Sequence, residues 1–165
     1  MPLGDPDPAS SAFVRLVGGR IWSNRIAALS QRTHAGPLSG RAAQQRHALE
    51  FALARAADPA GAAKTGPAER RVLGFAQDAV RLAQGLPAGP RARLRALLAE
   101  GLTGEATLIP LWHLLRSAAL YRERGFSVAF AGLAEGAPFD LRITRDGMVA
   151  EVACETVSAE EGRPV

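Results

Sequence analysis

The spacing of apolar residues changes once along this chain of 165 residues, and that change constrains the fold more than any other feature. Up to about residue 124 the apolar residues recur every three or four positions, as they do on one face of an α-helix. From Ser127 onward they alternate with polar residues, which is the pattern of a β-strand. The sequence therefore predicts an α+β fold, with a helical region at residues 11–101 followed by an α/β unit at residues 102–165.

The helical region is rich in Ala, Leu and Arg, which lose little side-chain freedom in a helix. Gly18-Gly19 is expected to split the first helix or to allow close packing, and Pro110 to kink or restart the last one. Residues 1–10 are predicted to be a disordered tail because Pro, Gly and Ser punctuate them. Helices are expected at residues 11–34, 41–57, 67–84, 91–100 and 103–124, with a turn at 35–40 and a linker at 58–67.

The α/β unit is expected to contain strands at residues 127–131, 139–144 and 148–157. A loop should join the first two strands, and a hairpin turn at Asp146-Gly147 should join the last two. Such an α-β-β-β run leaves one face of its sheet uncovered, although each layer must bury its apolar side against another. We therefore expect the chain to be part of a longer protein, whose continuation supplies at least one more helix.

Residues 111–163 show the order of elements and acids found in one nuclease family. A helix ends in Gly125-Phe126, and it is followed by a short strand, a strand that carries Asp140, a hairpin and an acid-bearing strand. This arrangement resembles the core of the PD-(D/E)xK nuclease superfamily. In that family the aspartate and a second acid bind Mg²⁺, which activates water for phosphodiester hydrolysis, and a lysine assists. The resemblance implies that Asp140 takes the place of the family's aspartate.

The third strand departs from the family's pattern. In the register set by Cys154, Ala153 takes the place of the second acid and Glu155 that of the lysine. A shift of two residues makes Glu151 the acid but leaves Ala153 in place of the lysine, and a shift of one turns the strand face over. The pair of acid and lysine is therefore incomplete in either register. This favours a degenerate member that binds nucleic acid or a protein without cleaving.

Two alternatives remain open from the sequence. One is a divergent Mg²⁺-dependent nuclease in which Asp140, Glu151 and Glu155 share a sheet face and hold the metal, with Arg142 as a displaced cation. The other is a structural interaction protein that docks through its helical half. In an interpretation that assigns the acids no function, Glu151 and Glu155 lie on a solvated strand face and pair with Arg142.

Charge and cysteine content limit the partners. Residues 1–100 carry 14 basic and 7 acidic side chains (+7), residues 101–165 carry 6 and 9 (−3), and the sum is the +4 of the whole chain. The basic half could contact nucleic acid, or its arginines could simply solvate helix faces.

The single Cys154, read as a buried small hydrophobic residue, excludes an intrachain disulfide. With neither a signal peptide nor an apolar span, we expect a cytoplasmic protein and no membrane partner.

Overall fold

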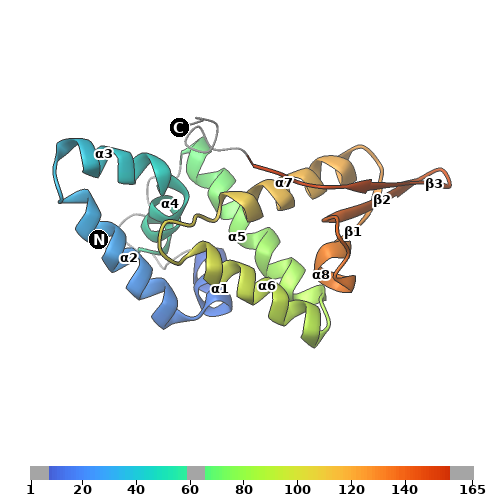
Figure 1. Ribbon diagram of the computed structural model, residues 1–165, viewed down its shortest axis with the longest axis horizontal. Coiled ribbons are helices and arrows are strands. Elements are labelled where there is room, and N and C mark those ends of the chain that lie inside the picture. The colour runs from blue at the N-terminus through green and yellow to red at the C-terminus, as the bar shows by residue number, and fades with distance from the viewer. Residues whose placement is uncertain (1–7, 59–65, 157–165) are drawn as a thin grey trace. The chain divides into compact units, whose positions relative to one another are not determined.

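The computed structural model describes residues 8–58 and 66–156, which fall into two compact units (Figure 1). We call them unit 1 (Met1–Leu108) and unit 2 (Ile109–Val165). The boundary follows Leu108, whereas the sequence pattern placed it after Gly101. Within the described residues, no helix has both the length and the apolar character needed to cross a membrane.

The described part of unit 1 is a bundle of α-helices. Its core contains Phe13, Leu29, Leu53, Phe75 and Leu94, each with at most 2% of its surface exposed. The Phe13 ring packs on Phe75, which joins α1 to α5. The helices are α1 (Pro8–Val17), α2 (Gly19–Thr33), α3 (Pro37–Arg46), α4 (Ala48–Ala57), α5 (Pro67–Gly85) and α6 (Ala88–Gly101).

The break between α1 and α2 lies at Gly18, whose φ of 105° suits a residue without a Cβ. The split predicted from Gly18-Gly19 is therefore confirmed. Helix α1 begins at Pro8, so residues 8–10 are helical and do not belong to the expected disordered tail. The hydroxyl of Ser10 is buried and donates to the Ala56 carbonyl oxygen at 3.4 Å. The rest of that tail lies outside the described residues.

Residues 35–57 differ from the sequence expectation at both ends of α3. Helix α3 begins at Pro37, inside the predicted turn, and the predicted single helix over residues 41–57 is broken at His47. The His47 side chain is buried, so a tertiary contact turns the chain where apolar spacing alone favours continuation. Pro67 is the first residue of α5, as predicted, while most of the expected linker lies outside the described residues.

Residues 102–108, here called the connecting segment, are not helical. A helix was expected from residue 103, but the Thr103 hydroxyl donates to the Ala99 carbonyl oxygen at 2.8 Å, near the end of α6. The next helix starts at Ile109, so Pro110 marks a restart in the first helical turn. The connecting segment therefore belongs to unit 1, which explains the later boundary.

Unit 2 combines helices with a small antiparallel sheet of order β1-β2-β3, and the predicted α+β class is confirmed. Helix α7 packs against β1, and α8 packs against β2 (Figure 1). Helix α8 occupies the predicted loop after the first strand. The elements are α7 (Ile109–Glu123), β1 (Ser127–Ala129), α8 (Ala131–Glu135), β2 (Leu141–Arg145) and β3 (Met148–Val152).

The predicted hairpin between β2 and β3 is confirmed. Asp146 and Gly147 form its turn with φ values of 51° and 78°, the left-handed pair typical of a two-residue hairpin loop. Strand β3 lies at the edge of the sheet, where Met148 and Val149 remain 77% and 62% exposed. It ends at Val152, earlier than predicted, and this shortening changes the geometry of the expected site.

Candidate functional site

Asp140 stands at the junction of β2 with the chain that follows β3. Its backbone N–H donates to the Val152 carbonyl oxygen at 3.0 Å. Its carboxylate Oδ2 accepts the backbone N–H of Cys154 at 2.7 Å. A charge-assisted hydrogen bond of this length is among the stronger kinds in proteins. The side chain that the nuclease resemblance assigns to metal therefore holds the end of β3 against the start of β2.

The main partner of Arg142 is a residue that the sequence analysis did not single out. Its guanidinium forms two parallel hydrogen bonds with the carboxylate of Glu135 in α8, at 2.8 and 2.9 Å. This contact holds the pKa of Glu135 below its ordinary value. Arg142 also lies over the Phe139 ring, 5.5 Å from its centroid. Its cross-strand neighbour is Glu151, which adds a weaker attraction. The predicted pairing with Glu151 is thus secondary to Glu135.

The three predicted acids do not gather into a metal site. Glu151 lies on β3, but Asp140 precedes the first paired residue of β2, and Glu155 follows the last paired residue of β3 and is exposed. Alternation of side chains between faces no longer applies beyond Val152, which is why the predicted shared face fails at Glu155. Across residues 8–58 and 66–156, no three His, Cys, Asp or Glu side chains are grouped so that they could hold a metal ion.

Cys154 is half-buried beside the same junction. Burial raises the pKa of its thiol, a hydrogen bond with Ser117 opposes that rise, and the charge of Asp140 adds to it. A raised pKa keeps the thiol protonated near neutral pH, so it is a poor nucleophile. The geometry agrees with a packing role for this side chain.

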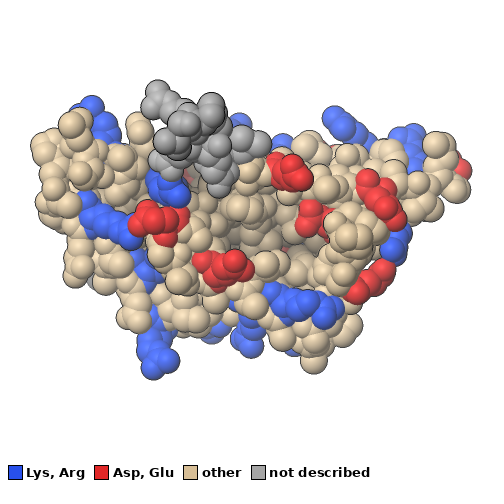
Figure 2. Space-filling model, viewed as in Figure 1, with Lys and Arg blue, Asp and Glu red and all other residues tan. Residues whose placement is uncertain are grey.

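Two further arginines of unit 2 lie over phenylalanine rings. Arg122 is 5.4 Å from the centroid of Phe130, and Arg145 is 5.5 Å from that of Phe126. Arg145 also donates to the Arg124 carbonyl oxygen at 2.8 Å. On the viewed face of each unit, acidic and basic side chains of the described residues are interspersed and do not separate by sign (Figure 2).

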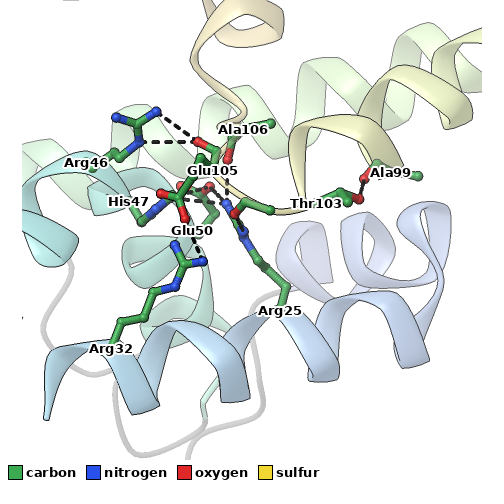
Figure 3. A network of polar contacts seen from close by, with 10 residues as sticks. Arg25, Arg32, Arg46, His47, Glu50, Ala99, Thr103, Glu105 and Ala106 are labelled. Atoms are coloured by element: carbon green, nitrogen blue, oxygen red, sulfur yellow. Dashed lines mark hydrogen bonds and ion pairs between the residues drawn. The ribbon is translucent and has the colours of Figure 1, made fainter. Parts of the chain in front are cut away.

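Unit 1 contains a buried polar cluster that the sequence analysis missed (Figure 3). It joins Arg25 of α2, His47 between α3 and α4, and Glu50 of α4, which are 5%, 1% and 0% exposed. Arg25 Nη2 lies 3.2 Å from His47 Nδ1 and 3.4 Å from Glu50 Oε1. Arg25 stands in helical register with buried Trp22 and Leu29, and an arginine within such an apolar stripe is the signal that could have revealed the cluster.

The cluster reaches the connecting segment through backbone carbonyls. Arg25 Nη1 donates to the Gly104 oxygen at 2.7 Å, and Nη2 donates to the Ala106 oxygen at 2.5 Å. Arg46 donates to the Glu105 oxygen from Nε at 3.2 Å and from Nη2 at 3.0 Å. Arg32 pairs with the Glu105 carboxylate at 2.7 Å. Three consecutive carbonyls are therefore held by two arginines, an arrangement that we call the carbonyl clasp.

Comparisons of the chain with known protein families, with curated proteins and with solved structures find no match.

Proposed function

We propose that the chain is a binding protein without cleavage activity, and that unit 2 is a degenerate PD-(D/E)xK-like module that engages a protein partner at the exposed edge of β3. One observation carries the proposal. Strand β3 is an edge strand on which Met148 and Val149 are largely exposed. The alternation of side chains along a strand places these two residues on opposite faces.

Edge strands normally carry features that prevent pairing with another chain, such as lysine, proline or a bulge. Strand β3 has the sequence Met-Val-Ala-Glu-Val and contains a single charged residue, Glu151. On its outer side β3 pairs with no other strand among residues 8–58 and 66–156, and this edge with its exposed apolar side chains suits the addition of an extended peptide segment. In that mode the backbone hydrogen bonds supply affinity, and the alternating side chains supply specificity.

The contacts at the predicted catalytic positions support a role without cleavage. A carboxylate oxygen of Asp140 accepts a hydrogen bond from the Cys154 backbone N–H, and Arg142 donates hydrogen bonds to Glu135. At the β3 edge a protein partner is favoured over nucleic acid, because Arg142 is already paired with the Glu135 carboxylate and its cross-strand neighbour Glu151 is acidic. Phosphate binding needs cations that are free to replace counterions.

The partner proposal is tested with two matched substitutions of exposed apolar residues. Val149→Lys places a charge on the β3 edge, whereas Leu38→Lys does the same at an 83% exposed position of α3. Proteins captured by the wild-type chain are identified by quantitative mass spectrometry, and the binding of each purified candidate is then measured by calorimetry. We expect a direct partner to bind wild type and Leu38→Lys but to lose at least about tenfold in affinity for Val149→Lys.

Binding that is equal for all three proteins would refute the β3 site. Binding to DNA or RNA that weakens steeply with salt and ignores Val149→Lys would replace the protein partner with nucleic acid.

The absence of cleavage is tested by thermal unfolding with and without Mg²⁺ or Mn²⁺. Because native-state binding raises the midpoint, a metal site would show as stabilisation by the ion. We expect the same midpoint with and without metal for wild type and for Asp140→Asn, which keeps an acceptor oxygen for Cys154. A rise in wild type that vanishes in Asp140→Asn would revive the nuclease alternative with Asp140, Glu151 and Glu155.

A further inference from the structure

The cluster of Arg25, His47 and Glu50 contains more acceptors than one of its donors can serve. Arg25 Nη2 carries two hydrogens, but the Ala106 oxygen, His47 Nδ1 and Glu50 Oε1 all lie within 3.4 Å of it. Meanwhile Arg25 Nε and Glu50 Oε2 are buried without a hydrogen-bond partner among the described residues. The hydrogen bonds of the cluster are therefore in competition, and a small change in protonation can redistribute them.

The hydrogen bonds that form in the cluster depend on whether His47 Nδ1 carries a hydrogen. It lies 3.2 Å from Arg25 Nη2 and 3.3 Å from Glu50 Oε1. In the neutral ring with hydrogen on Nε2, Nδ1 can only accept, so it takes the hydrogen of Arg25. In the charged ring Nδ1 carries hydrogen, so it can only donate, and its acceptor is Glu50. One nitrogen thus has two exclusive partners, and protonation of the tautomer with hydrogen on Nε2 exchanges Arg25 for Glu50.

We propose that protonation of His47 opens the Arg25 half of the carbonyl clasp and loosens the connecting segment, which Arg32 and Arg46 continue to contact through Glu105. The added proton turns Nδ1 towards Glu50 and removes the hydrogen bond from Arg25. Two cations then share the carboxylate of Glu50 in a buried site, and like charges at this distance repel strongly. Arg25 is the donor to the Gly104 and Ala106 carbonyls, so its displacement breaks both contacts.

The charges around His47 fix the direction of the switch. Glu50 faces it from α4, and Arg25 and Arg32 act on it from α2. Burial lowers the pKa of His47 from its ordinary value near 6.5, Glu50 opposes this, and the two arginines reinforce it. Arg32 and Arg46 are also tied to the connecting segment through Glu105, on its carboxylate and its carbonyl respectively. At neutral pH the ring is therefore uncharged and the clasp is closed.

The connecting segment ends at the boundary between the two units, so the clasp acts on the chain that joins them. Its closed form fixes backbone that has no helix or strand of its own. Opening the clasp would leave the ladders of α5 and α6 intact while freeing this stretch. The inference does not depend on the partner proposed for unit 2, because every group that it uses lies in unit 1.

Hydrogen exchange of the full chain at a series of pH values from about 7.5 down to about 4 tests the proposal, since an ordinary histidine titrates between about pH 5 and 8 and burial lowers the pKa of His47. The reporters are the amides of Leu102, Thr103 and Ala106, which donate to Ala99, Glu100 and Thr103. After correction for the intrinsic rate, we expect these amides to exchange at least about tenfold faster at the lower pH, while α5 stays protected. In His47→Asn, whose side chain does not titrate, the pH dependence should disappear.

Loss of protection in α5 with the same midpoint would overturn the proposal, because it would mean that the cluster controls global stability. An unchanged pH dependence in His47→Asn would overturn it as well. If that variant does not fold, NMR titration of the wild type decides. The ring signal of His47 and the amide signals of Gly104 and Ala106 should move with one midpoint, and different midpoints would refute the link.

Discussion

Each unit contains an arginine paired with a glutamate, and the two pairs differ in every respect that matters for stability. In unit 2, Arg142 and Glu135 form two short hydrogen bonds of 2.8 and 2.9 Å, with side chains 36% and 50% exposed. In unit 1, Arg25 and Glu50 approach only to 3.4 Å, but their side chains are 4% and 0% exposed. The pair with the shorter hydrogen bonds is therefore the one whose charges are screened by water.

The comparison shows that distance alone is a poor guide to the importance of an ion pair. Exposed pairs contribute little because solvent screens the attraction and the long side chains lose freedom. A buried pair costs desolvation to form, yet the loss of one partner leaves an unpaired charge inside the protein. We therefore expect unit 1 to depend on Arg25 and Glu50 much more than unit 2 depends on Arg142 and Glu135.

The largest effect is expected from Arg25→Met, which leaves the Glu50 carboxylate buried without its cation. The Gly104 and Ala106 carbonyls lose their donors in the same step. Removal of one partner of a buried pair typically costs about 3–5 kcal/mol, and we expect a loss of that order in the free energy of unfolding of unit 1. Denaturant titration in a Trp112→Phe background, where Trp22 of unit 1 reports, measures it.

The double variant Arg25→Met/Glu50→Met is the control for that substitution. It removes both charges, so no unpaired ion remains, and the stability should return part of the way towards wild type. Recovery should be incomplete because the two carbonyls still lack donors. If the double variant were less stable than Arg25→Met, the attraction between the charges would not be what Arg25 contributes, and the comparison between the units would lose its basis.

A smaller effect is expected from Asp140→Ala in unit 2. The substitution leaves the Cys154 N–H without its acceptor, and an unmet backbone donor of this kind costs about 1–3 kcal/mol. Asp140→Asn keeps an oxygen in place and should cost less. Thermal unfolding of unit 2 and exchange of the Cys154 amide measure both. Equal stability of wild type and Asp140→Ala would mean that Asp140 is not used structurally, which would reopen the question of what its carboxylate is for.

The elements that local pattern determines were predictable. The hairpin follows from Asp146-Gly147, the break between α1 and α2 from Gly18, and the start of α5 from Pro67, because each residue restricts the backbone by itself. The change from helical to strand spacing near residue 125 gave the α+β class for the same reason. These features need no knowledge of distant contacts.

What the sequence pattern could not supply depends on contacts between distant residues. The break at His47 and the irregular connecting segment both contact Arg25, which lies more than 20 residues from either. The shared face expected for Asp140, Glu151 and Glu155 required β3 to continue, but the strand ends at Val152. Glu135 was expected in a loop, so its hydrogen bonds with Arg142 could not be predicted from the sequence. Local spacing carries no information about such pairings.

The smallest effect is expected from Glu135→Gln, and it sharpens the comparison through pH. Arg142 holds the pKa of Glu135 below its ordinary value of 4.5, so this carboxylate stabilises the folded state above that value, and the contribution is lost as pH falls further. His47 has a lowered pKa as a base, so unit 1 begins to lose stability already as pH falls below its ordinary value of 6.5. At neutral pH the Glu135→Gln midpoint should lie only slightly below wild type, because both side chains of the pair are solvent-exposed, and the difference should vanish as Glu135 becomes protonated. Acid unfolding followed by separate probes in the two units should therefore show unit 1 weakening first, and only the later transition, in unit 2, should respond to Glu135→Gln.

An acid transition in unit 1 that moved with Glu135→Gln would show that the two pairs are coupled, and the contrast between a buried pair and a screened pair would then describe one linked system.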